Sequence, residues 1–202
     1  MAGSSERARL LVEGMGSSTS TNLMAVACQP MVMGWGHLRG GDVDAALALL
    51  EEALEAAVRG QMMFEPMTLI LLAQAHAMAG DPAAGLAAAR RAHAIAVNEM
   101  PFHAPEAGRV IGELLLATGR DQVEALTALR EASGTAARHG NVVHELRART
   151  SLLRAVRRHD HANVAAEEET LRAVCDGLTP GSQLAELPAA RAELAADLPS
   201  TY

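Results

Sequence analysis

Aromatic residues are scarce in this sequence. Of its 202 residues, two are phenylalanine, one is tryptophan and one is tyrosine, which together make 2% of the chain. Sandwiches and barrels of strands depend on aromatic and β-branched side chains, so the composition disfavours them. Alanine, leucine, glutamate and arginine are abundant instead, and all four favour helices. Because half of the residues are apolar, the chain can bury one sizeable core, and we predict a single all-α domain.

Lysine is absent. All seventeen basic side chains are arginine, against 24 acidic ones, and the net charge is −7. A negative field of this size repels phosphate backbones, so we predict that the protein does not bind nucleic acid. We interpret five arginines at helical spacing as a solvent-facing surface, paired with Glu145 and with the glutamates at 167–169. These arginines are Arg147, Arg149, Arg154, Arg157 and Arg158.

Cysteine is rare as well, since Cys28 and Cys175 are the only two and lie far apart. They predict neither a disulfide framework nor a zinc site, and favour reduced thiols in the cytoplasm. Long apolar runs are also missing, because serine, threonine, Gln29 and Pro30 interrupt the longest uncharged stretch, 14–38. That stretch is a poor membrane span, and the N-terminus lacks the apolar segment of a signal peptide. We expect a cytoplasmic protein with no membrane segment, metal or cofactor.

A repeat of about forty residues is present. Gly41, Gly80 and Gly119 are each 39 residues apart, and each ends an apolar stretch. Glycine in the left-handed conformation ends a helix, and the aspartates that follow, such as Asp42 and Asp81, can cap the next one. Small and apolar residues then recur at a spacing of four and three, which lets helices approach closely. These stripes are Ala46, Leu50, Ala53; Gly85, Ala89, Ala92; Ala125, Leu129, Ala132; and, more weakly, Ala166, Thr170, Ala173.

The spacing predicts four helix pairs. First helices are expected at 22–39, 66–79, 105–118 and 142–158, and second helices at 43–59, 82–97, 122–138 and 163–174. Pro30 should kink the first of them or mark its true start. A short helix near Glu6–Met15 precedes the pairs, and a capping helix near 184–198 follows. One pair cannot bury its apolar face alone, so we predict a right-handed α-solenoid with repeats at 22–60, 61–100, 101–140 and 141–176 and a cap at 177–202.

These features resemble the tetratricopeptide repeat, although the period of 39–41 residues exceeds the usual length of about 34. The period looks more like that of the repeats in bacterial signal-transduction ATPases and maltose-regulator-type activators. The stretches GWGHLRGGDVDAALALLEEAL, GELLLATGRDQVEAL and HELRARTSLLRAV are similar to the C-terminal repeat region of adenylate-cyclase-associated ATPases. The resemblance covers about residues 22–195 and implies a solenoid used for regulation or partner binding. The chain lacks the phosphate-binding loop, the cyclase domain and any DNA-reading module of such regulators, and CDGLTPGSQLAEL replaces the family's aromatic C-terminal segment.

In such repeats the first helices line a concave face, so the resemblance implies which residues face the groove. The groove would be rich in methionine in its N-terminal half and charged in its C-terminal half. Methionine suits surfaces that accept varied apolar ligands, but it also fills cores that lack aromatic residues, and both interpretations stay open. The implied groove residues are Met31, Trp35 and Arg39; Met67, Ile70, Gln74 and Met78; Glu106, Arg109 and Glu113; and Ser151, with Arg158 as a further candidate.

The titratable residues also allow two interpretations. Glu106, Arg109 and Glu113 have helical spacings of three and four, which is typical of an exposed ion-pair ladder. In a closed groove, Glu113 could instead be a general base while Arg109 orients an anion. His37 and His76 are 39 residues apart, and we interpret them as interior side chains. The alternative is a metal-binding or catalytic pair, with His76 as the catalytic candidate. No metalloprotease or nucleophile motif accompanies them.

We therefore predict a non-enzymatic, regulatory interaction module. It would bind a peptide or protein segment in the groove through apolar anchors and Arg–Glu pairs. One alternative is a small apolar molecule held in a pocket near Trp35 and the methionines. Another is an enzyme that uses Glu113, Arg109 or a histidine in that pocket, because fold alone does not decide function. The first repeat is too apolar for an end cap, so the N-terminal helix or a second copy in a homodimer would cover it.

Overall fold

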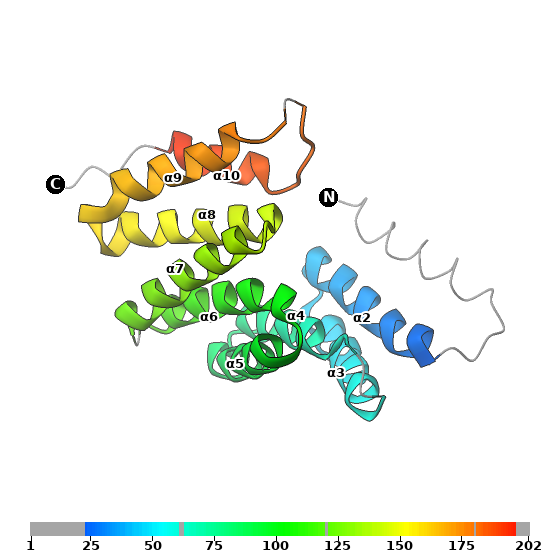
Figure 1. Ribbon diagram of the computed structural model, residues 1–202. Helices are drawn as coiled ribbons and strands as arrows, with labels where there is room; N and C mark the ends of the chain where they lie inside the picture. The colour runs from blue at the N-terminus through cyan, green and yellow to red at the C-terminus, as the bar shows by residue number, and fades with distance from the viewer. Residues whose placement is uncertain (1–22, 61–62, 120, 180, 197–202) are drawn as a thin grey trace. The chain divides into compact units, whose positions relative to one another are not determined.

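The computed structural model describes residues 23–60, 63–119, 121–179 and 181–196, and the side chains of 23–27 lie outside this description. Within these ranges the chain forms nine α-helices and two short 3-10 helices, without a strand (Figure 1). The predicted all-α class is therefore confirmed. The chain divides after Met100 into two compact units, and each is described by itself. Among the helices that are described, none is long and apolar enough to cross a membrane.

The first unit consists of two helix pairs. In each pair the second helix packs against the first, and α3 also packs against α4. The apolar core between them includes Leu38, Leu50 and Leu72, with Met31 and Met67 packed at its edge. Although Pro30 lies within it, α2 is a single helix. The helices are α2 (Leu23–Gly40), α3 (Val43–Arg59), α4 (Glu65–Met78) and α5 (Pro82–Glu99).

The second unit begins with a 3-10 turn and continues with helices that pack in order along the chain. In addition, α6 packs against α8, and α10 packs against both α8 and α9. Leucines such as Leu129, Leu152 and Leu171 form its core. The elements are η1 (Pro101–His103), α6 (Ala104–Thr118), α7 (Gln122–Arg138), α8 (Val142–His159), η2 (His161–Asn163), α9 (Val164–Asp176) and α10 (Leu187–Ala195).

The predicted glycine turns join the helices of three pairs. Gly41 and Gly80 both have a φ of +83°, and Gly119 has a φ of +64°, a region that favours glycine. Asp42 and Asp81 then cap the following helices, because each side chain accepts a hydrogen bond from the backbone N–H of the residue three positions later. These turns end one helix and start the next, so the 39-residue spacing of the sequence sets the spacing of the helix pairs.

The small residues predicted to lie between paired helices are buried in the first three pairs. Ala46, Ala89 and Ala125, for example, are fully inaccessible to solvent. The weaker fourth stripe was a wrong prediction, because Ala166 and Ala173 are exposed on α9. Instead, α9 buries Val164, Leu171 and Cys175, a face turned away from the expected one.

The predicted helix boundaries are close to the observed ones. The predicted ranges 43–59 and 122–138 coincide with α3 and α7, and the other first and second helices differ by at most two residues at each end. The capping helix is shorter than predicted, at 187–195, because Pro188 sits in its first turn and starts it late. The expected helix at Glu6–Met15 lies outside the described residues. The prediction of a single domain stays a prediction.

Candidate functional site

In the first unit, the predicted groove residues form two stripes. Met31, Trp35 and Arg39 follow one another at a spacing of four on α2, where Trp35 is 44% exposed and Arg39 is exposed. Met67, Gln74 and Met78 share one side of α4, and Met78 is 54% exposed. The 39-residue offset makes Trp35 and Gln74 equivalent positions of two successive pairs.

Two of these methionines and one isoleucine do not face solvent freely. Met31 and Met67 pack partly against the core, and Ile70 is only 1% exposed. At these positions methionine fills the core, which agrees with the interpretation of methionine as a substitute for missing aromatic residues. Trp35 and Met78 are different, because both of these large apolar side chains are exposed to solvent.

The first unit carries a net negative charge. Residues 23–100 contain four arginines and eight aspartates and glutamates. Arg59 lies 4.0 Å from Glu55, and Arg91 is paired with Glu65.

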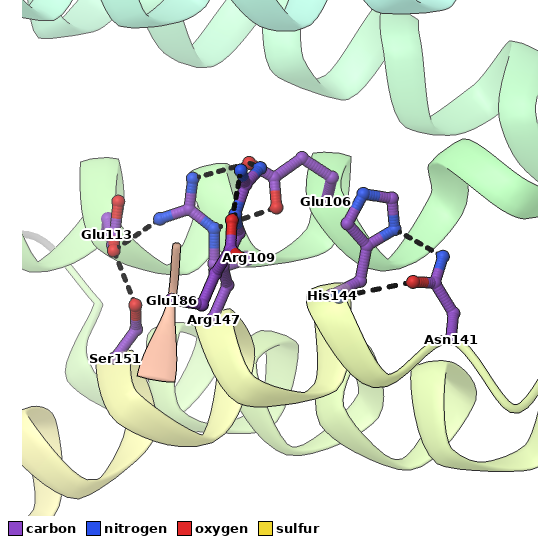
Figure 2. A network of polar contacts seen from close by, with 8 residues as sticks. All are labelled: Glu106, Arg109, Glu113, Asn141, His144, Arg147, Ser151 and Glu186. Carbon is purple, nitrogen blue, oxygen red and sulfur yellow. Dashed lines mark hydrogen bonds and ion pairs between the residues drawn. The ribbon is translucent and has the colours of Figure 1, made fainter. Parts of the chain in front are cut away.

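In the second unit, the predicted residues Glu106, Arg109 and Glu113 lie along α6 and belong to one network (Figure 2). Arg109 donates two hydrogen bonds to Glu106, Nε to Oε2 at 3.0 Å and Nη2 to Oε1 at 2.8 Å. Its third nitrogen, Nη1, lies 2.6 Å from Glu113 Oε1. The three residues do form the ion-pair ladder, but Glu106 is only 4% exposed, so this ladder is not a solvated surface.

Arg147 extends the network from α8 to both neighbouring segments. Its Nη1 lies 3.3 Å from Glu106 Oε1, and its Nε and Nη2 donate to Glu186 Oε1 at 3.0 and 2.7 Å. One guanidinium thus links α6, α8 and the residue that precedes α10. The arginine cluster was predicted to pair with Glu145 and with the glutamates at 167–169, whereas Arg147 pairs with Glu106 and Glu186.

The buried carboxylate stays ionised in this setting. Burial alone would raise the pKa of Glu106, but the charge and hydrogen bonds of Arg109, the charge of Arg147 and then that of His144 outweigh burial, and the pKa lies below its ordinary value. Burial lowers the pKa of Arg109, but Glu106 and Glu113 raise it above the ordinary value. The network therefore holds fixed charges at neutral pH.

Glu113 and Ser151 are brought together across α6 and α8. The Ser151 hydroxyl donates to Glu113 Oε1 at 2.6 Å, the same oxygen that faces Arg109. Ser151 is buried, and Glu113 is the more exposed of the two, with 41% of its side chain in solvent. The pair therefore forms a hydrogen bond between α6 and α8.

A second polar cluster lies at the start of α8. The Asn141 side chain accepts a hydrogen bond from the His144 backbone N–H at 3.2 Å and places its Nδ2 2.8 Å from His144 Nδ1 (Figure 2). The Phe102 ring, 59% exposed, lies with its centroid 5.2 Å from that of His144 and 5.4 Å from that of His103. His103 Nδ1 is buried without a hydrogen-bond partner among the described residues. Burial lowers the pKa of both histidines.

The two histidines singled out from the repeat are not interior. His37 has 39% of its side chain exposed, and its Nδ1 lies 3.1 Å from Asp42 Oδ2, which corrects the interior interpretation. His76 is half-buried near the end of α4. Within the described ranges, no group of three or more histidine, cysteine, aspartate or glutamate side chains could hold a metal ion.

The arginine cluster of α8 mixes solvent-facing and interior side chains. Arg149 pairs with Glu145 at 2.8 Å, as predicted, and Arg158 is exposed. Arg157 is 5% exposed, which contradicts the prediction of a solvent-facing surface. Its Nη2 donates to Glu168 at 2.6 Å and its Nη1 to Glu193 Oε1 at 3.3 Å, so it holds α9 and α10 to α8.

A cavity of about 320 Å³ lies where α9 ends and α10 packs. Leu178, Leu187 and Cys175 form apolar parts of its wall, and Arg191 and Ser182 form polar parts. It belongs to the second unit, whereas the pocket near Trp35 and the methionines was predicted in the first. Cys175 is nearly inaccessible, and burial raises the pKa of its thiol.

No family model, curated protein or solved structure matches the chain. The resemblance to tetratricopeptide repeats and to ATPase regulators thus gains no support from known proteins. What stands is an all-helical chain whose helices pack in sequential pairs.

Several residues of these clusters were not predicted. Phe102, Asn141, His144 and Glu186 carry contacts that no motif marked. The sequence did contain one signal for Asn141, because a glycine followed by a capping residue also occurs at Gly41 and Asp42. In the structure, Gly140 has a φ of +64° and Asn141 caps α8 with its side-chain amide. Contacts such as that of Glu186 with α8 depend on packing between segments that are far apart in the sequence.

Proposed function

We propose that the chain is a helical-repeat interaction module, related to tetratricopeptide arrays, whose α2 and α4 stripes bind an apolar segment of a partner protein. The observation that carries this proposal is the exposure of Trp35 and Met78, 44% and 54%, on the first helices of two successive pairs. Tryptophan is over-represented among residues that dominate binding energy, and helical repeats commonly bind extended segments. The 39-residue offset of the glycine turns supports the repeat assignment.

The charge of the first unit specifies the partner further. Eight carboxylates against four arginines favour a segment with arginine or lysine beside its apolar anchors. Arg39, exposed at the end of the α2 stripe, gives such a segment an orientation, because an acidic residue would pair with it at one end only.

The test uses the whole chain and a phage-displayed library of random linear peptides. Selected sequences should combine an aromatic or aliphatic pair with basic residues. Trp35 is the only tryptophan, so its emission reports this surface alone, and a bound peptide should shift that emission to shorter wavelength. Peptides that bind without changing the emission, or a selection that enriches no sequence, would contradict the proposal.

The cavity between α9 and α10 favours a second candidate function, small-molecule binding. Its volume of about 320 Å³ lies at the lower end of the range for ligand pockets. Arg191 in the wall would suit a ligand that joins an apolar body to a negative group. Native mass spectrometry of gently purified protein should then show an added mass of a few hundred daltons, which Ser182→Trp removes by filling the cavity. A chain without added mass would favour the interaction module.

A further inference from the structure

We propose that the start of α8 is a pH-sensitive element of the second unit, in which protonation of His144 breaks its bond with the capping Asn141 side chain and weakens the first turn of α8. The inference is independent of the proposed partner surface. It rests on the directions of the hydrogen bonds at Asn141 and on the groups that surround the His144 ring.

The Asn141 amide allows only one form of the His144 ring. Its Oδ1 accepts the hydrogen bond from the His144 backbone N–H at 3.2 Å, which caps α8. Its Nδ2, which can only donate, therefore faces His144 Nδ1 at 2.8 Å, and Nδ1 must accept. The ring is neutral, with its proton on Nε2.

A second proton on this ring has no acceptor. A proton on Nδ1 would point at the Asn141 Nδ2 hydrogens, so two donors would face each other. Rotating the amide by half a turn would turn Oδ1 to the ring, but it would then turn Nδ2 to the His144 backbone N–H and lose the cap. Either way, protonation removes one of the two hydrogen bonds that Asn141 makes at the start of α8.

The opposite side of the ring is occupied as well. The Phe102 ring packs against the His144 ring with centroids 5.2 Å apart. His144 thus contacts η1 as well as the Asn141 side chain that caps α8.

The surrounding charges do not stabilise the protonated His144 ring. Among the described residues, Glu106 of α6 is the carboxylate whose charge raises the pKa of His144, and Arg109 and Arg147 already donate hydrogen bonds to it. From η1, His103 adds repulsion when it is protonated, and its own buried Nδ1 lacks a partner among the described residues. At the exposed end of α7, Arg138 donates to Thr135.

The direction of the pH effect follows from linkage. Burial lowers the pKa of His144, Glu106 partly offsets this, and Arg147 and His103 lower it further. In the unfolded chain the ring binds a proton near pH ~6.5. The folded unit keeps this stability above that pH and loses it as the pH falls from there to the folded pKa.

The test begins with histidine ring NMR of the intact chain. His144 should titrate below pH ~6.5, and the amide signals of the first turn of α8 should shift or broaden with the same midpoint. Asn141→Asp keeps a capping oxygen and adds an acceptor for Nδ1–H, so the His144 midpoint should rise above that of the wild type by more than one unit.

Thermal unfolding supplies the second readout. Between pH 7.5 and 5.5, the melting temperature should fall more in the wild type than in Asn141→Asp or in His144→Gln, whose amide oxygen can accept but does not titrate. His139→Gln, in the exposed residue that follows α7, is the matched control and should behave like the wild type. A wild-type His144 midpoint at or above that of an unfolded histidine, or an Asn141→Asp midpoint equal to that of the wild type, would overturn the proposal.

Discussion

Replacing Glu106 by glutamine tests whether the network of α6 and α8 stabilises the second unit. The carboxylate is 4% exposed and receives hydrogen bonds from Arg109 at 3.0 and 2.8 Å and from Arg147 at 3.3 Å. Glutamine keeps the shape but removes the charge that compensates two guanidinium groups. Breaking a buried ion pair from one side costs roughly 3–5 kcal/mol.

The expected loss lies below that range. Arg109 keeps Glu113 at 2.6 Å, and Arg147, with 42% of its side chain exposed, keeps Glu186 at 2.7 Å. We therefore expect Glu106→Gln to lower the free energy of unfolding by about 2–3 kcal/mol. Glu113→Gln is the matched control, because Glu113 is 41% exposed on the same helix, and its loss should stay below about 1 kcal/mol.

The assay is urea unfolding followed by circular dichroism at pH 7 and at lower pH. Because the pKa of Glu106 is lowered in the folded state, its stabilisation is present above the pKa of an unfolded glutamate and is lost as the pH falls through the folded pKa. The difference between wild type and Glu106→Gln should therefore shrink in acid. A loss no larger than that of Glu113→Gln, or a difference that does not change with pH, would refute this reasoning.

Three further predictions concern packing. Gly112→Ala should destabilise the fold by about 1–2 kcal/mol, because the added Cβ would lie 2.6 Å from a leucine side chain of α7. Gly134→Ala should instead stabilise the fold by up to about 1 kcal/mol, because its added Cβ meets only the flexible end of an arginine at 3.4 Å. Both variants are measured in the same urea assay. Arg157→Met should release α10, so limited proteolysis should cut before this helix faster than in the wild type; equal cutting rates would count against the assigned role. Cys28, half-buried, should react with a thiol reagent before Cys175, which is 5% exposed, and labelling followed by mass spectrometry would show the reverse order if the burial were wrong.

Local signals were sufficient to predict the helices. Gly41 and Gly80 each end a helix with positive φ, and the aspartate after each caps the next helix, so both events are encoded within a few neighbouring residues. The fourth pair lacks a glycine at this turn, and Asp160, bonded by Arg130 and Asn163, occupies it instead. The prediction of which face of α9 is buried was therefore wrong, because it assumed the same turn geometry as in the first three pairs.

The functional candidates were less predictable. Periodicity placed Glu106, Arg109 and Glu113 on one side of a helix, but it could not predict that Arg147 and Ser151 would meet them from α8. The periodicity could not predict which charged residues are buried. Arg157 is of a residue type that usually lies on the surface, but it lies inside, where Glu168 and Glu193 neutralise its charge. Such pairs form between residues far apart in the sequence, and only packing brings them together.

The most direct test of the proposed binding surface compares Met78→Glu with Val97→Glu. Both residues are 54% exposed, and each change adds the same charged side chain, but Met78 lies on the α4 stripe and Val97 on α5. With a peptide selected on the wild-type chain, the dissociation constant should rise at least about tenfold for Met78→Glu, equivalent to roughly 1.4 kcal/mol, and by less than about twofold for Val97→Glu. Equal effects of the two variants, in either direction, would contradict binding at α2 and α4.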